Sequence, residues 1–329
     1  MQVAQVTHTT PAERALYDAG MQPFRFGVQC SVSPSIAAWR DLARKSESLG
    51  YSCLYIPDHF GDQFGPLVAL TVAAEATTTL RVGSLVFDND YRHPVVLAKE
   101  IATLDLASEG RIEFGLGAGW MKSDYDESGM PYDAAGVRVE RMLEGLEVMR
   151  RLWGSEKASF SGKHYTITDA HGLPRPFSSP HPPIVIGGGS KRILSIAGRE
   201  ADIVGINPDM RAGYVGREVT AGVVTEKWDE RLSWVREAAG DRFDSLELQI
   251  LTVMVMVVPN RDEAIASAAP LFGLPPEVLG EIPIGVVGTV DEICEQLVAR
   301  RERWGFNYIV VHGGELEAFA PVVERLAGT

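Results

Sequence analysis

Eight short apolar runs alternate with eight amphipathic segments along most of this chain, and no other feature of the sequence restricts its fold as strongly. A short apolar run bounded by Gly, Pro or polar residues is typical of a strand buried on both faces of a parallel sheet. Apolar residues that recur every three or four positions predict helices. The expected strands cover residues 24–29, 54–56, 80–87, 111–117, 183–187, 202–206, 247–257 and 308–311, and the expected helices cover residues 34–49, 66–77, 94–108, 137–153, 190–200, 219–239, 289–304 and 315–326.

In a chain of 329 residues, this alternation predicts a closed (β/α)8 barrel (TIM barrel), with an open, doubly wound sheet as the alternative. No linker rich in Pro and Gly divides residues 24–329, so we expect them to form a single domain. Residues 1–23 form an N-terminal extension, in which Thr10-Pro11-Ala12-Glu13 predicts the start of a short helix. Inserted loops are expected after strand four, helix four and strand seven, at 120–136, 154–182 and 259–288, with a small hairpin at 158–167 and short helical pieces in the last.

The charge and the cysteines exclude several classes of function. The net charge is −13, from 31 Lys and Arg against 44 Asp and Glu, which disfavours attraction to nucleic acid or to an anionic membrane. No apolar run reaches the roughly 18 residues that span a bilayer, and the N-terminus lacks the pattern of a secretory signal. The 3 cysteines have no metal-ligand spacing. We therefore expect a cytoplasmic protein without a metal, with a small molecule as its partner.

A carboxylate and an imidazole stand directly after the second expected strand. Residues 54–56 are apolar, Pro57 ends the run, and Asp58 and His59 follow at once. Folds with parallel strands place their chemistry at the carboxyl ends of those strands. The two side chains are therefore candidate catalytic residues, although an Asp that caps the loop and a His that packs beneath it would give the same pattern.

Two glycine-rich segments also follow expected strands. Residues 115–120 read Gly-Leu-Gly-Ala-Gly-Trp, which permits close approach of the backbone but lacks the spacing of a dinucleotide-binding fingerprint, and tight packing at the barrel rim is the alternative. Residues 187–190 read Gly-Gly-Gly-Ser at the start of a helix, where free N–H groups favour an anion; a flexible turn is the alternative. No GxSxG, HExxH or Walker motif supports a hydrolase or a phosphoryl transferase.

Together these segments resemble the luciferase-like monooxygenase superfamily, whose members are flavin- or deazaflavin-dependent (β/α)8 enzymes. The resemblance extends from residue 24 to about residue 311. Within the superfamily, the Asp58-His59 pair resembles the subgroup that uses the deazaflavin coenzyme F420. The residues that carry the resemblance are 50–60, 80–83, 92–94, 103–105, 110–111, 115–120, 186–189, 200–204 and 288–289.

The resemblance implies how the cofactor would bind. Its ring would lie across the carboxyl end of the barrel, beside Asp58 and His59, with His59 as proton donor or as the group that stabilises the reduced ring. A non-proline cis peptide behind the ring would fall at Leu85-Val86, and the loop at 187–190 would hold the phosphate. The implied catalytic residues are His59, Asp58 and Trp120, and the implied cofactor-binding residues are Asp58, Leu85, Val86, Asn89, Gly117, Ala118, Gly119, Gly187, Gly188, Gly189 and Ser190.

Trp120 marks a departure from part of the superfamily. Some deazaflavin-dependent sugar-phosphate dehydrogenases carry a Glu proton donor where Trp120 stands here, and Trp cannot donate a catalytic proton. This favours an apolar or aromatic substrate near Trp120, unless its ring packs against the cofactor instead. The expected function is that of a homodimeric oxidoreductase that moves a hydride between F420 and a small organic substrate. The alternatives are an FMN-dependent monooxygenase that uses O2 and a partner reductase, and a non-catalytic flavin- or deazaflavin-binding protein.

Overall fold

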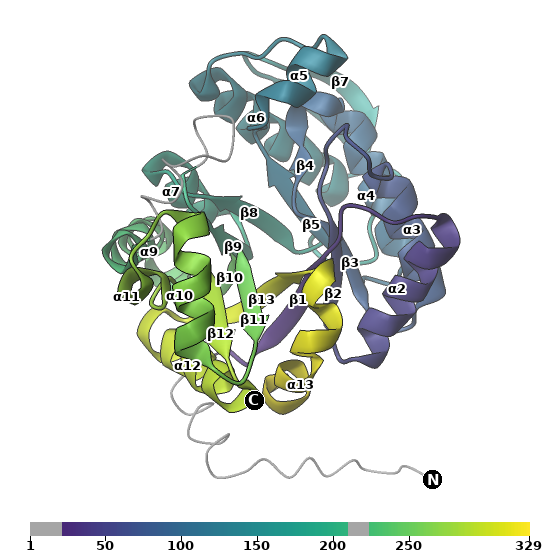
Figure 1. Ribbon diagram of the computed structural model, residues 1–329. Coiled ribbons are helices and arrows are strands. Elements are labelled where there is room, and N and C mark those ends of the chain that lie inside the picture. Colours follow the sequence, from purple (N-terminus) through teal and green to yellow (C-terminus); the bar gives the residue numbers. More distant parts are fainter. Residues whose placement is uncertain (1–21, 210–223) are drawn as a thin grey trace.

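Eight parallel strands close into a barrel in the computed structural model of the protein, which describes residues 22–209 and 224–329. β1 pairs with β2 and with β13, and β3 pairs with both β2 and β5, so that the sheet has no free edge at that point. This confirms the (β/α)8 barrel and excludes the open sheet (Figure 1). The barrel strands are β1 (Arg25–Gln29), β2 (Cys53–Ile56), β3 (Arg81–Ser84), β5 (Ile112–Gly117), β8 (Ile184–Gly188), β9 (Ile203–Ile206), β10 (Glu247–Leu251) and β13 (Phe306–His312).

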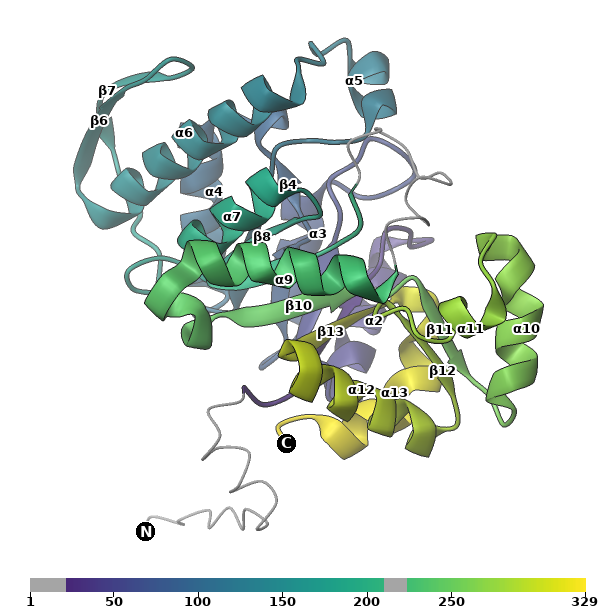
Figure 2. The ribbon, with the colours of Figure 1, turned by 90° about the vertical axis from the view of Figure 1, so that its left-hand side faces the viewer.

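Helices surround the barrel (Figures 1 and 2). Their ends follow local signals, since Ser35 accepts the backbone N–H of Ala38, and Thr289 forms a capping box with Glu292. The helix expected at residues 10–19 and the start of the one expected at 219–239 lie outside the described residues. The helices are α2 (Ile36–Ser48), α3 (Pro66–Ala76), α4 (Pro94–Ala107), α6 (Ala135–Gly154), α7 (Lys191–Glu200), α9 (Thr225–Ala239), α12 (Val290–Trp304) and α13 (Leu316–Leu326), and the 3-10 turns are η1 (Asn89–Tyr91), η2 (Gly240–Ser245) and η3 (Gly313–Glu315).

Successive residues of each strand face opposite sides of the barrel wall, and both sides are packed, which explains why most residues of the strands are apolar. In β2, Cys53 and Tyr55 belong to the inner cluster with Tyr308, whereas Leu54 and Ile56 belong to the large core between strands and helices. Gly83 makes room for the ring of Tyr55, because a Cβ atom there would lie 2.8 Å from that ring. The inner wall is therefore a packed layer rather than a pore.

Two expected strands are interrupted. The third ends at Ser84, continues after the non-proline cis peptide Leu85-Val86, and resumes as β4 (Phe87–Asp88), so the predicted position of that cis bond is confirmed. The seventh leaves the barrel at Thr252, whose N–H and hydroxyl both bond the Val310 carbonyl, and continues as β11 (Met254–Val257). There it pairs with β12 (Gly285–Gly288), a strand that the sequence reading missed, and α10 (Arg261–Phe272) and α11 (Pro276–Leu279) lie between them in the sequence.

The insertions differ in how well they were predicted. The hairpin is confirmed as β6 (Lys157–Ser161) and β7 (Thr166–His171), which extend beyond α6 (Figure 2). The loop expected after strand four is wrong at its start, because α5 (Lys122–Ser128) forms there and ends at Gly129 in the left-handed conformation. Within the described ranges, no helix is both long enough and apolar enough to cross a bilayer. The same ranges hold no group of three or more His, Cys, Asp or Glu that could bind a metal ion.

Candidate functional site

The carboxyl ends of β2 and β5 bring two of the predicted catalytic residues into contact. The ring centroids of His59 and Trp120 lie 5.8 Å apart at an interplanar angle of 83°. The cis peptide after β3 lies close to β5, since a Cβ atom on Gly117 would come within 2.6 Å of Val86. Predicted residues that end or follow β2, β3 and β5 thus lie close together at the carboxyl end of the barrel.

Asp58 is engaged with Arg92 rather than with its neighbour His59. The guanidinium of Arg92 donates to both carboxylate oxygens of Asp58, at 2.5 and 3.1 Å, and the backbone N–H of Asp88 donates to one of them at 3.0 Å. The Asp58 side chain is 2% exposed. Such a bidentate, buried pair fixes the loop after β2 to the start of α4, and a catalytic role of Asp58 stays a prediction.

His59 is held by a residue that the sequence reading missed. Its Nδ1 lies 2.6 Å from Oδ2 of Asp124, on α5, and the same oxygen accepts the hydroxyl of Tyr91 at 3.0 Å. The Asp124 side chain is 5% exposed and that of His59 is 24% exposed. A carboxylate at Nδ1 accepts the proton of that nitrogen, so Nε2 is the nitrogen left to act on a ligand. No local pattern marked Asp124, because it lies 65 residues from His59 in a segment expected to be a loop.

A second buried network begins at Tyr125, which follows Asp124 on α5 and contacts the ring of Tyr91. The Tyr125 hydroxyl is 3.1 Å from a carboxylate oxygen of Asp88 and 3.1 Å from one of Asp90, and Arg141 forms an ion pair with Asp90. Tyr125 has a single proton to donate to the two carboxylates. Burial, together with the neighbouring charge of Asp90, raises the pKa of Asp88 to about 7. A protonated Asp88 that donates to Tyr125 would satisfy all three groups.

Asn89, a predicted cofactor-binding residue, is buried against the helix α6 and the hairpin. Its Nδ2 donates to the hydroxyl of Tyr165 in the hairpin at 3.1 Å, and its side chain packs on Gly145 of α6. Gly119, with φ of +73°, lies against Tyr125 and Asp88, where a Cβ atom would clash. The structure therefore assigns these two predicted residues a packing role, and contact with a ligand stays a prediction for them.

The loop between β8 and α7 has the properties that the sequence predicted for an anion site. A Cβ atom on Gly189 would clash with the backbone of Pro208, and one on Gly188 would clash with Ile193, so the loop depends on glycine. Ser190 precedes α7 without a side-chain capping bond, so its hydroxyl and the first N–H groups of the helix are not engaged by a cap. Lys191 and Arg192 are exposed beside them, and Arg192 forms an ion pair with Glu140 at 3.6 Å, whereas Lys191 forms no ion pair with any described residue. This donor set fits a phosphate.

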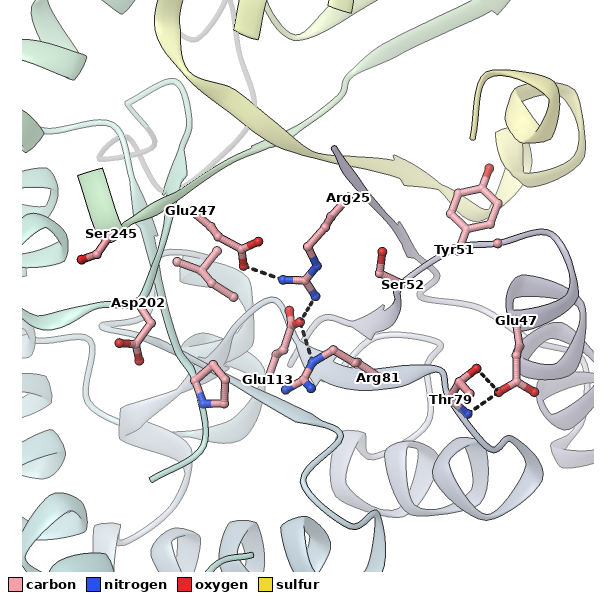
Figure 3. A pocket seen from close by; sticks show the side chains of 13 residues that line it. Arg25, Glu47, Tyr51, Ser52, Thr79, Arg81, Glu113, Asp202, Ser245 and Glu247 are labelled. Carbon is pink, nitrogen blue, oxygen red and sulfur yellow. Dashed lines mark hydrogen bonds and ion pairs between the residues drawn. The ribbon is translucent and has the colours of Figure 1, made fainter. Parts of the chain in front are cut away.

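A cavity of about 660 Å³ lies at the opposite, amino end of the barrel. Figure 3 shows the residues that line it. Arg25 and Arg81 both point toward Glu113 and form ion pairs with it, and Arg25 also forms an ion pair with Glu247. The Glu113 side chain is fully buried, and its second oxygen accepts the hydroxyls of Tyr55 and Tyr308. Because these charges are bonded to one another at the barrel's stabilising end, we assign this cluster to stability and not to the chemistry.

The comparisons with known proteins agree with the fold. A family model described as luciferase-like monooxygenase matches residues 19–281. An F420-dependent glucose-6-phosphate dehydrogenase from Amycolatopsis mediterranei is 26% identical over 83% of this chain and 88% of its own length. Among solved structures, the coenzyme F420-dependent tetrahydromethanopterin reductase from Methanopyrus kandleri has a TM-score of 0.73 at 18% identity, covering 93% of this chain and 100% of that one. An FMN complex of the oxygenating constituent of 3,6-diketocamphane monooxygenase from Pseudomonas putida has a TM-score of 0.68 at 17% identity, covering 93% and 96%.

Proposed function

The chain belongs to the luciferase-like monooxygenase family, and from this membership and the site geometry we propose that it is an F420-dependent oxidoreductase. It transfers a hydride between the deazaflavin coenzyme F420 and a small organic substrate. The single observation that carries the proposal is the His59–Asp124 pair beside Trp120, in a chain that is similar over most of its length to an F420-dependent dehydrogenase. A buried carboxylate on Nδ1 is the arrangement by which proteins orient a histidine for proton transfer.

The residues at the carboxyl end fit the cofactor. Gly187 to Ser190 and the first N–H groups of α7 would hold its phosphate, and the backbone at Leu85-Val86 and Gly117 would support its ring. When bound, F420 supplies the hydride chemistry, and the protein supplies orientation and one proton. His59 takes up or releases that proton at Nε2, and Asp124 holds the imidazole and stabilises its protonated form. Asp58 acts through Arg92, which fixes the loop that carries His59.

A pair of fluorescence titrations tests the cofactor. The purified protein is titrated with F420 and, separately, with FMN. We expect saturable binding of F420 at micromolar concentrations and much weaker binding of FMN. The reverse order would overturn the F420 assignment and favour a monooxygenase that consumes O2. Binding of neither cofactor would favour a protein without this chemistry.

We further propose that the protein acts as a cytoplasmic homodimer. Exposed apolar side chains on neighbouring helices support an association surface, since Val68 on α3 is 65% exposed and Val96 on α4 is 50% exposed. Cys30, Cys53 and Cys294 are free thiols, which suits a reducing compartment. The mass in solution, measured by light scattering, tests the dimer, and the mass of a single chain would overturn it.

A further inference from the structure

Aromatic rings dominate the side of the site that carries His59. Phe60 stands next to it in sequence, is 43% exposed, and packs on Tyr91 with ring centroids 4.5 Å apart. Tyr91 contacts Tyr125, which contacts Tyr132 at 4.8 Å. The Tyr132 hydroxyl donates to the backbone carbonyl of Trp120 at 3.0 Å. The partly exposed rings of Phe60 and Trp120 are therefore joined, next to His59, by a continuous series of aromatic contacts and the hydrogen bond of Tyr132.

The charges of the same wall are mostly acidic. The loops at residues 57–65, 85–93 and 118–134 carry 8 Asp and Glu against 2 cations, Arg92 and Lys122. Both cations are already paired, Arg92 with Asp58 and Lys122 with Asp126. All residues of these three loops lie within the described ranges.

The two arginines of α6 that face this wall are engaged as well. Arg138 donates to the backbone carbonyls of Ala118 and Gly119, and Arg141 forms ion pairs with Asp90 and Asp133. Within the loops after β2, β4 and β5, no described Lys or Arg is therefore left to receive a substrate phosphate. A phosphate monoester carries about −1.5 to −2 charges near neutral pH, and these three described loops offer it no unpaired Lys or Arg.

We propose that the substrate is an uncharged aromatic alcohol, or the corresponding ketone, held against Trp120 and Phe60, and that it is not a sugar phosphate. This inference rests on the proposed function. In the oxidation, the carbinol carbon gives its hydrogen with two electrons as a hydride to oxidised F420, and the hydroxyl proton goes to Nε2 of His59, so that a C=O bond forms. Reduction of the ketone runs through the same atoms in reverse, with reduced F420 as the hydride donor.

The test compares 1-phenylethanol with glucose 6-phosphate on the protein loaded with oxidised F420, following loss of cofactor fluorescence. We expect 1-phenylethanol to reduce the cofactor with a kcat/KM at least about 100-fold above that of glucose 6-phosphate, the scale on which an apolar pocket discriminates against an added polar group. Trp120→Ala is expected to raise KM for the aromatic alcohol about tenfold, through loss of ring contact. Trp120→Phe should restore most of it. Phe177→Ala is the matched control, because Phe177 is 60% exposed and contacts Gly110, before the amino end of β5.

Direct binding separates this inference from the proposed function. Ligand-observed NMR with acetophenone and with glucose 6-phosphate is recorded on the protein with and without F420. Binding of acetophenone that weakens in Trp120→Ala supports the substrate class even if F420 fails to bind, in which case the proposed function alone falls. Turnover or binding of glucose 6-phosphate at least equal to that of the aromatic probes, or an unchanged aromatic KM in Trp120→Ala, would overturn the inference.

Discussion

At the scale of single residues, the pairing of His59 with Asp124 predicts two distinct losses of activity. His59→Gln removes the group that carries the proton, so kcat should fall by about 10²–10⁴-fold while the Kd for F420 stays unchanged. Asp124→Asn keeps the shape but presents an amide to Nδ1, which no longer holds the imidazole with its proton on Nδ1 or stabilises its charged form. We expect kcat to fall by about 10²-fold or more, together with an altered pH profile. Steady-state kinetics across pH measure both effects.

The matched control for Asp124→Asn lies on the same short helix. Asp126 is 58% exposed and pairs with Lys122, so Asp126→Asn should leave kcat and the pH profile unchanged. A wild-type pH profile and kcat in Asp124→Asn would show that Asp124 does not orient His59. Equal losses in both variants would point to the folding of α5 instead.

The raised pKa of Asp88 predicts how the stability of the fold depends on pH. Its pKa is about 7 in the folded protein, against about 4 for an exposed Asp. The folded state therefore binds the proton more tightly, and the free energy of unfolding should fall as pH rises between these values, by up to about 3–4 kcal/mol. Asp88→Asn mimics the protonated acid and should flatten this decline. Urea unfolding at about pH 5 and pH 8 measures the difference, and an unchanged slope in the variant would contradict the assignment.

At the scale of elements, the sequence predicts most strongly where the pattern is local. The apolar run at 54–56 and the turn into Asp58 and His59 were sufficient to place β2 and its candidate site, because buried parallel strands and their ends have a clear signature. The segment that became α5 carries no apolar periodicity, and its Asp124 is fixed by His59 and Tyr91, from distant parts of the chain. Likewise, β12 exists only because β11 leaves the barrel to pair with it. Such tertiary contacts have no local trace in one sequence.

A substitution in the loop between β8 and α7 should weaken cofactor binding. In Gly189→Ala the added methyl group clashes with the backbone of Pro208, so the loop must shift away from its position at the helix start. We expect weaker binding of F420 and a loss of about 1–3 kcal/mol in the free energy of unfolding. Gly154→Ala is the control, because apart from its chain neighbours and the backbone of its own helix, no atom lies within 4 Å of its Cβ position. If Gly189→Ala bound F420 as tightly as the wild type, the loop would not be the phosphate site.

At the scale of the whole molecule, the two ends of the barrel have different roles, one in the proposed chemistry and the other in stability. The candidate site lies beyond the carboxyl ends of β2 and β5, whereas the cluster of Arg25, Arg81 and Glu113 lies at the amino end. Glu113 alone holds two guanidiniums and two tyrosine hydroxyls from β1, β2, β3 and β13. One buried carboxylate thus connects four other strands of the barrel. A change there should act on stability and leave the chemistry intact.

Glu113→Gln tests this division. It removes the only charge that compensates Arg81 in the described ion pairs and one of the two that compensate Arg25, so the free energy of unfolding should fall by about 3–5 kcal/mol. Burial alone would raise the pKa of Glu113, but Arg25 and Arg81 outweigh it and lower that pKa. Its contribution is therefore present above the ordinary pKa of a Glu, and it is lost as pH falls through the lowered value. Urea unfolding across acidic pH should show this loss in the wild type and not in the variant.

Glu317→Gln, at an exposed ion pair with Lys45, serves as the control. Unchanged stability in Glu113→Gln together with weaker F420 binding would mean that the two ends of the barrel are not separate.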